Sequence, residues 1–158
     1  MNAFRSAVTF HQSKPAPCGS SERENLPIGD SAVVIAYARC PANLTPLQVT
    51  RGSEYEFYVL PDQRWIDFFI PSGPDGYARS LIAPIQERFR KCKPLPDANW
   101  FALAGAIDRP TNHPFFIGSG PKLVPFNAEG RLILFANDAR GFYWNNFGCL
   151  TVVITRIR

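Results

Sequence analysis

Fifteen prolines are spread along the 158 residues, and they limit what this chain can fold into more than any other feature. Each proline lacks a backbone donor and clashes with the preceding helical turn, so long helices are excluded over most of the sequence. Between the prolines and glycines lie short segments rich in aromatic and β-branched residues, a pattern typical of strands. The chain is therefore predicted to be all-β.

Alternation of apolar and polar residues locates the strands. Tyr55, Phe57 and Val59 fall on one face of a strand over 54–60, as do Leu150, Val152 and Ile154 near the C-terminus. Residues 65–77 are dense in turn residues and are predicted to be a loop. Further strands are predicted over residues 31–40, 47–50, 99–107, 115–118, 122–126, 130–136 and 150–156.

One helix is predicted, from about residue 79 to 91. Leu81, Ile85 and Phe89 recur every four residues there and so share one face, with Pro84 in the first turn or before it. About eight short strands with a single helix predict a jelly-roll β-sandwich.

The length suits one folded domain, which we place at residues 29–158. Residues 1–28 are polar and show no periodicity, so they are predicted to form an N-terminal arm, flexible or lying on the domain. No apolar run reaches the ~18 residues that cross a bilayer, and the first segment lacks a signal-peptide core. We expect a soluble protein without a membrane span, either cytoplasmic or exported without a Sec signal.

The four cysteines, at positions 18, 40, 92 and 149, do not have metal-binding spacing. Without a secretion signal, buried free thiols are the expectation, although the sequence leaves the state of each cysteine open.

Composition and motifs argue against two classes of function. The chain has only two histidines and contains no G-x-S-x-G, H-E-x-x-H or P-loop motif, so we do not expect an enzyme. The net charge of +4 is scattered and the densest basic run, residues 88–93, is short, so we do not expect nucleic-acid binding.

The segment between the last two predicted strands, residues 137–148, carries the candidate chemistry. A hairpin needs about two to five residues to turn, and this segment is far longer. Asp138, Asn145 and Asn146 offer hard oxygen atoms, and Gly141 allows a turn that points backbone carbonyls inward. Ca²⁺ takes about six to eight such oxygens, whereas zinc and copper prefer softer ligands that the segment lacks. The alternative is that these are ordinary turn residues.

The sequence NDARGFYWNNFG, followed by LTVVIT, resembles the C-terminal signature of the PA-I-type galactophilic lectins of bacteria. That signature runs roughly N-D-x-P-G-x-Y-x-N-N-S-G before an alternating strand, and a weaker similarity extends over about residues 50–158. The resemblance implies a jelly roll of the galactose-binding-domain-like type. It also implies one calcium ion that bridges the loop to sugar hydroxyls, and it leaves a homo-oligomer open.

Carried over residue by residue, the resemblance makes Asp138, Asn145 and Asn146 the side-chain ligands of the calcium. Phe142 gives its backbone carbonyl, and a second carbonyl from the earlier aromatic loop is placed at Phe68. The sugar contacts that follow are Asp138, Asn145, Trp144 and Asp67.

Several positions depart from the signature. Arg140 stands where the family has proline, Trp144 and Phe147 replace small residues, and the family's sugar-contacting His and Gln have no match. Trp144 either stacks on a sugar or covers the site. We therefore expect calcium-dependent binding of a galactoside or glycoconjugate. The alternative is a protein-interaction module of the same fold, with a structural calcium or no metal. Exposure of Trp65, Trp144 and Phe147 near one another would favour that module, whereas Trp65 could instead belong to the core.

Overall fold

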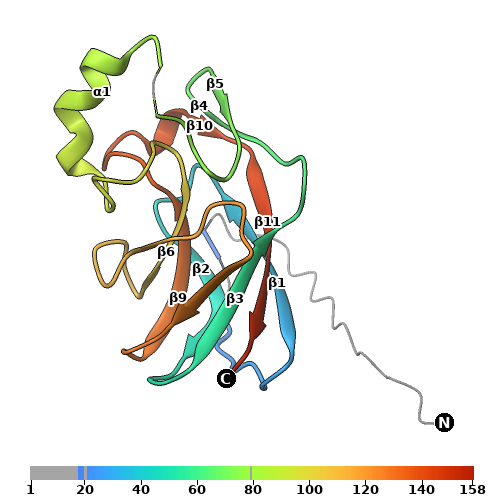
Figure 1. The fold of residues 1–158 in the computed structure, drawn as a ribbon. Helices are drawn as coiled ribbons and strands as arrows, with labels where there is room; N and C mark the ends of the chain where they lie inside the picture. The colour runs from blue at the N-terminus through green and yellow to red at the C-terminus, as the bar shows by residue number, and fades with distance from the viewer. Residues whose placement is uncertain (1–17, 20, 79) are drawn as a thin grey trace.

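The structure, a computed structural model, describes residues 18, 19, 21–78 and 80–158 (Figure 1). Its described strands form three antiparallel sheets, ordered β1-β11-β3-β8, β2-β9-β6-β7 and β10-β4-β5. The first sheet contains β1 (Ser31–Tyr37), β11 (Cys149–Arg156), β3 (Glu54–Val59) and β8 (Lys122–Pro125). The second contains β2 (Asn43–Val49), β9 (Gly130–Ala136), β6 (Leu103–Ile107) and β7 (Phe115–Phe116). The small third sheet contains β10 (Asn146–Phe147), β4 (Trp65–Asp67) and β5 (Ile70–Ser72).

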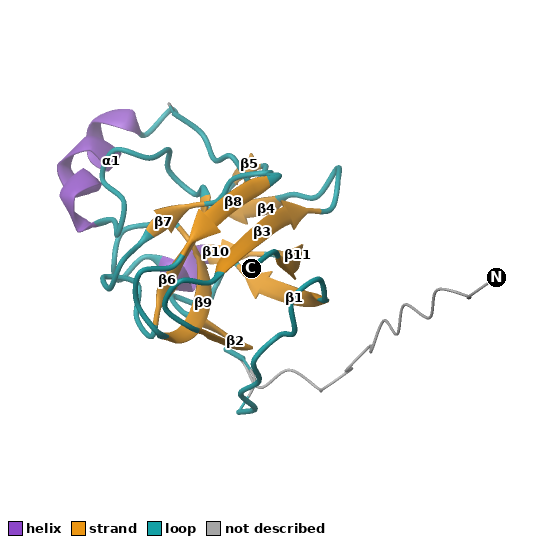
Figure 2. Cartoon of the chain, turned by 60° about the horizontal axis from the view of Figure 1, so that its bottom comes forward, coloured by secondary structure: helices purple, strands orange, loops and turns teal. Residues whose placement is uncertain are grey.

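The core lies between the two larger sheets, which face each other (Figure 2). Phe57 and Ile154 are register partners on β3 and β11, and both are fully buried. They belong to the same apolar cluster as Leu132 and Leu134 of β9 in the opposite sheet. The predicted β-sandwich is confirmed, and the residues predicted to face inward on β3 and β11 do so.

The prediction of a loop over residues 65–77 is wrong in part, because β4 and β5 form a hairpin there. Its two-residue turn consists of Phe68 and Phe69, so the usual Gly or Asn signal of a hairpin is missing. The strand predicted over residues 47–50 begins earlier, because β2 runs through Pro46. An edge strand tolerates a proline, and the β2–β9 register shifts between Leu44 and Gln48.

The helix is shorter than predicted. α1 spans Ala83–Phe89, with Pro84 in its first turn, and a 3-10 turn, η1 (Arg90–Cys92), follows. Leu81 and Ile85 are exposed, and the helical residue that is buried is Gln86. Figure 1 shows why the apolar spacing misleads: α1 stands to the side of the two main sheets and does not lie on either face. No helix of the described residues is long and apolar enough to cross a bilayer.

The described part of the N-terminal segment runs along the edge of β2. Leu44 N–H donates to the carbonyl of Cys18 (2.9 Å), Gln48 N–H donates to the carbonyl of Glu24 (2.8 Å), and Leu26 packs in the core. The predicted arm spans residues 1–28, and its first part, residues 1–17, lies outside the described residues.

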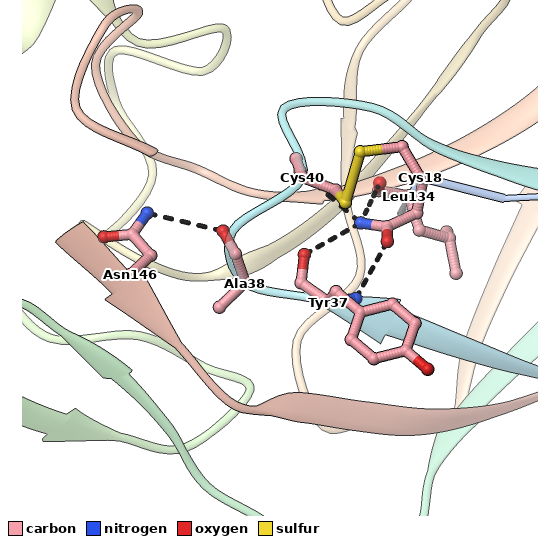
Figure 3. Close-up of a disulfide and its surroundings, with 7 residues drawn as sticks. Cys18, Tyr37, Ala38, Cys40, Leu134 and Asn146 are labelled. Atoms are coloured by element: carbon pink, nitrogen blue, oxygen red, sulfur yellow. Dashed lines mark hydrogen bonds between the residues drawn. A yellow bond between two sulfur atoms is a disulfide. The ribbon is translucent and has the colours of Figure 1, made fainter. Parts of the chain in front are cut away.

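Cys18 and Cys40 form a disulfide (Figure 3), so the expectation of free thiols is wrong for this pair. Their sequence separation of 22 gives no signal, because the bond depends on the N-terminal segment lying against β2. Of the other two cysteines, Cys92 is exposed rather than buried, and Cys149 is half-buried; both are free.

The disulfide links the N-terminal segment to the connection between β1 and β2. Asn43 fixes the same connection through hydrogen bonds. The buried Asn43 amide donates to the carbonyls of Tyr37 and Leu134 (both 3.0 Å) and accepts from Tyr37 N–H (2.9 Å). In the same connection, the carbonyl of Ala38 accepts from Asn146 Nδ2 at 3.4 Å (Figure 3). The disulfide-linked turn therefore contacts the loop that carries the candidate ligands.

Replacing Cys18 and Cys40 together by serine is expected to lower the free energy of unfolding by about 3 kcal/mol. The cross-link restricts the unfolded chain, and a loop of this length gives that magnitude. Urea denaturation at neutral pH measures the change, and Cys92→Ser, at an exposed free thiol, is the control. Equal stability of the double variant and the wild type would contradict the assignment of the disulfide.

Candidate functional site

Two buried side chains fix the base of the 137–148 loop. The Asn137 amide donates to the carbonyls of Leu95 (2.9 Å) and Asn99 (3.0 Å), and it accepts from Leu95 N–H (3.0 Å). The Tyr143 hydroxyl donates to the carbonyl of Ala136 at the end of β9 (2.6 Å). Asn137 thus holds the 95–99 segment, whereas the side-chain oxygens of Asn145 and Asn146 are not used in this way.

Pairing of β10 with β4 brings two distant segments together. Asn146 lies opposite Asp67 in the register, and Phe68 N–H donates to the carbonyl of Asn145 at 3.2 Å. Phe68 has φ of +56°, a left-handed conformation that is rare for a bulky residue. The turn that carries Phe68 therefore keeps its backbone beside Asn145; that the Phe68 carbonyl binds a metal stays a prediction.

Asp138 lies at the centre of the candidate ligands, and its side chain is almost completely buried. The residue is 3% exposed, Oδ1 accepts from Ala139 N–H (2.7 Å), and Oδ2 accepts from Asn146 Nδ2 (2.9 Å). Burial raises the pKa of this carboxyl to about 6, and the negative charge of nearby Asp67 raises it too. Burial and the Asp67 charge both disfavour the ionised carboxylate, and a bound cation would offset them because it favours the ionised form.

Two amide oxygens beside Asp138 are buried without a hydrogen-bond partner. They are Oδ1 of Asn145 and Oδ1 of Asn146, and no described residue donates to either. An unsatisfied buried acceptor costs about 1–3 kcal/mol, so such a pair needs an explanation. A metal ion that takes oxygen ligands would satisfy both atoms.

The donor set fits calcium better than a softer metal. The described residues contain no group of three or more His, Cys, Asp or Glu side chains that could hold an ion. The carboxylates near the loop are Asp138 and Asp67, and the other available atoms are amide and backbone oxygens. Hard oxygens with few charges are a calcium set, whereas zinc favours nitrogen and sulfur.

A polar chain that the sequence analysis missed holds Asp67. The Tyr77 hydroxyl donates to Asp67 Oδ2, Gln86 Nε2 donates to the Tyr77 hydroxyl (2.6 Å), and Ser80 Oγ donates to Gln86 Oε1 (2.6 Å). Burial raises the pKa of Asp67, and the Tyr77 bond acts in the opposite direction. No local signal in the sequence indicates this polar chain, because Gln86 and Tyr77 meet only in the folded structure.

Exposed aromatic side chains lie next to the candidate ligands in the chain and in the β4–β5 turn. Trp144 is 67% exposed, and Phe68, Phe69 and Phe147 are each about half exposed. Phe142 is partly covered, because its ring packs edge-on against Phe89 of α1 with centroids 5.2 Å apart. The Phe142 carbonyl accepts from Asn145 N–H (3.3 Å) and so lies in the same turn as the amides.

Trp65 is not part of this surface. It is fully buried, and its indole N–H donates to the carbonyl of Phe101 at 3.1 Å. Of the two alternatives for Trp65, exposure on an interaction surface and burial in the core, the structure shows the second; its position on β4, facing the core, explains the burial.

The N-terminal domain of EclA, a solved structure described as a PllA-like lectin, is similar in fold to this chain. The TM-score is 0.52, with 18% identity, over 80% of this chain and 94% of that chain. The chain has a lectin-like fold. No family model and no curated protein sequence matches it. At this identity the likeness establishes the fold, and the PA-I-type family remains a prediction.

The raised pKa of Asp138 predicts a pH dependence of stability in the calcium-free protein. The folded-state pKa of about 6 exceeds the unfolded value of about 3.9, so this group stabilises the fold below pH 4. That stability is lost as the pH rises through 6. Urea denaturation in the presence of a chelator measures the effect. Between pH 4 and 7, the free energy of unfolding of the wild type should fall by about 2–3 kcal/mol more than that of Asp138→Asn. Parallel pH profiles for the two proteins would contradict the raised pKa.

Proposed function

We propose that this protein binds carbohydrate through a Ca²⁺ ion held by the 138–146 loop, and that the sugar is a galactoside. The observation that carries the proposal is the pair of buried, unpartnered oxygens of Asn145 and Asn146 beside the buried Asp138 carboxyl. The lectin-like fold supports a binding role rather than catalysis.

The side chains of Asp138, Asn145 and Asn146 would hold the ion, together with the backbone carbonyls of Phe142 and Phe68. Bound calcium would supply a positive charge with open coordination positions for neutral sugar hydroxyls. The Tyr77 hydrogen bond orients Asp67, which is 7% exposed, and in this proposal the Asp67 carboxylate would accept from a sugar hydroxyl. With few charged ligands, the calcium affinity should be modest and should increase when sugar is present.

In this proposal the Trp144 ring would stack on the apolar face of the sugar. It is exposed and lies one residue before Asn145. Trp144→Ala is expected to lower the affinity for a galactoside about five- to tenfold, which is the usual size of a ring contact. Calorimetry would measure it, and Trp144→Phe should recover part of the loss. If Trp144→Ala bound sugar more tightly, the ring would be a cover over the site.

The exposed aromatic residues support a second candidate function, binding of a partner protein. Phe69, Trp144 and Phe147 are the kind of side chains that anchor protein interfaces. Such a function does not require the amide oxygens to face a cation, so the unpartnered atoms favour the carbohydrate proposal.

Retention on a galactose-substituted resin tests the proposed function. We expect retention in calcium, elution by free galactose and elution by a chelator. Retention that survives both eluents, or a lack of retention in calcium, would contradict it.

A further inference from the structure

Three of the four outer edges of the two larger sheets are protected. The β2 edge pairs with the N-terminal segment through Cys18 and Glu24, and β7 is only Phe115–Phe116. The β8 edge carries Lys122 and ends at Pro125. Charge, proline, shortness and cover are the usual means of preventing edge-to-edge pairing.

The fourth edge, β1, has none of these features. Its sequence, SAVVIAY, contains neither charge nor proline, and its one strand partner is β11. Asp30 O accepts from Arg156 N–H (3.0 Å), and Ala38 N–H donates to Gly148 O (3.0 Å). The even-numbered residues between them therefore bond to β11, because the pattern alternates in an antiparallel pair.

It follows that the backbone groups of Ser31, Val33 and Ile35 point away from β11. Within the described part of the chain, no residue forms a hydrogen bond to them. Tyr37, the next residue whose backbone groups point outward, is already satisfied, since the Asn43 amide forms hydrogen bonds with both its N–H and its carbonyl. An open row of three residues is left in the middle of the strand.

The outer face beside this row is apolar. Val33 is 51% exposed and Ile35 is 47% exposed. Val33 lies in register with Val153 of β11, which lies in register with the exposed Tyr58 of β3. An apolar row therefore crosses the sheet and ends at the open edge.

We propose that a second copy of this chain pairs antiparallel with the β1 edge, so that the two sheets become one continuous sheet. A two-fold axis at Val33 sets Ser31 against Ile35 of the second copy, and all three open residues are paired. It also places Val33 beside Val33 of the second copy and extends the apolar row across the junction.

Charge at the ends of β1 favours a second copy as the occupant. Asp30 precedes the strand and Arg39 follows it; both are exposed, and neither takes part in a described ion pair. Antiparallel pairing sets the acidic end of each strand toward the basic end of the other. The proposal uses no atom of the calcium site and stands independently of the proposed function.

Gel filtration with light-scattering detection, on the 158-residue chain, tests the association. We expect wild type to have twice the mass of the 17.7-kDa chain, and Val33→Lys to have the mass of one chain. Leu123→Lys is the matched control, because Leu123 is also 51% exposed but lies on the opposite, protected edge of the same sheet. This variant should keep the wild-type mass.

Hydrogen exchange distinguishes this pairing from any other dimer. The amides of Val33 and Ile35 should exchange at least about tenfold more slowly in wild type than in Val33→Lys, as expected for hydrogen-bonded amides. A wild-type mass of one chain over about a hundredfold range of concentration would overturn the proposal. A dimer that persists in Val33→Lys, or fast exchange of both amides in a wild-type dimer, would overturn it as well.

Discussion

Replacing Asp138 by asparagine is expected to lower the affinity of the protein for calcium at least about 100-fold. Removing even an outer-shell partner of a metal ligand typically costs about 10–100-fold, and Asp138 is the proposed direct carboxylate ligand. The calcium-free fold should not lose stability at neutral pH, because the substitution removes a charge that burial disfavours. Calorimetric titration of calcium into both proteins measures the effect.

The matched control is Asp62→Asn. Asp62 is an exposed carboxylate between β3 and β4 with φ of +60°, a conformation that asparagine also tolerates. Its removal changes the net charge of the protein by the same amount and should leave the calcium affinity unchanged. An Asp138→Asn protein that binds calcium like wild type would place the metal site elsewhere or exclude it.

Truncating Trp65 to alanine is expected to lower the free energy of unfolding by about 3–5 kcal/mol. The ring is fully buried against Phe101, with centroids 5.2 Å apart, and its loss would also leave the Phe101 carbonyl without its indole donor. Because Trp65 is on β4, which pairs with β10, we also expect weaker calcium binding in the folded fraction.

Urea denaturation measures the effect of Trp65→Ala, with Ile66→Ala as the control. Ile66 is the next residue of β4 and is exposed, so its truncation should cost less than about 1 kcal/mol. Similar losses for the two variants would mean that Trp65 does not anchor the small sheet to the core.

The sandwich could be predicted in part because two of its strands, β3 and β11, obey a local rule. Burial alternates with every second residue in β3 and β11, so Phe57 and Ile154 reveal their positions from sequence. The β4–β5 hairpin could not be predicted this way, because its turn holds two phenylalanines where glycine is usual. The disulfide and the burial of Gln86 depend on which distant segments meet, and a short stretch of sequence does not carry that information.

The same division applies to the candidate site. Asp138, Asn145 and Asn146 lie within one loop, so the sequence pattern was sufficient to select them together. Their link to Phe68 and Asp67 requires the β10–β4 pairing, which was not predicted from the sequence; only the resemblance selected these two residues. Tyr77 belongs to the same network through a single hydroxyl, and nothing in its neighbouring residues indicated this role.

The measurement that tests the account most directly is a calorimetric titration of galactose into the wild-type protein, first with calcium and then after chelation. The account predicts sugar binding that requires calcium, and calcium binding that is tighter when sugar is present. Calcium binding without any response to galactose would contradict the carbohydrate proposal. If neither calcium nor sugar bound, the 138–146 loop would be an asparagine-rich turn on a lectin-like fold.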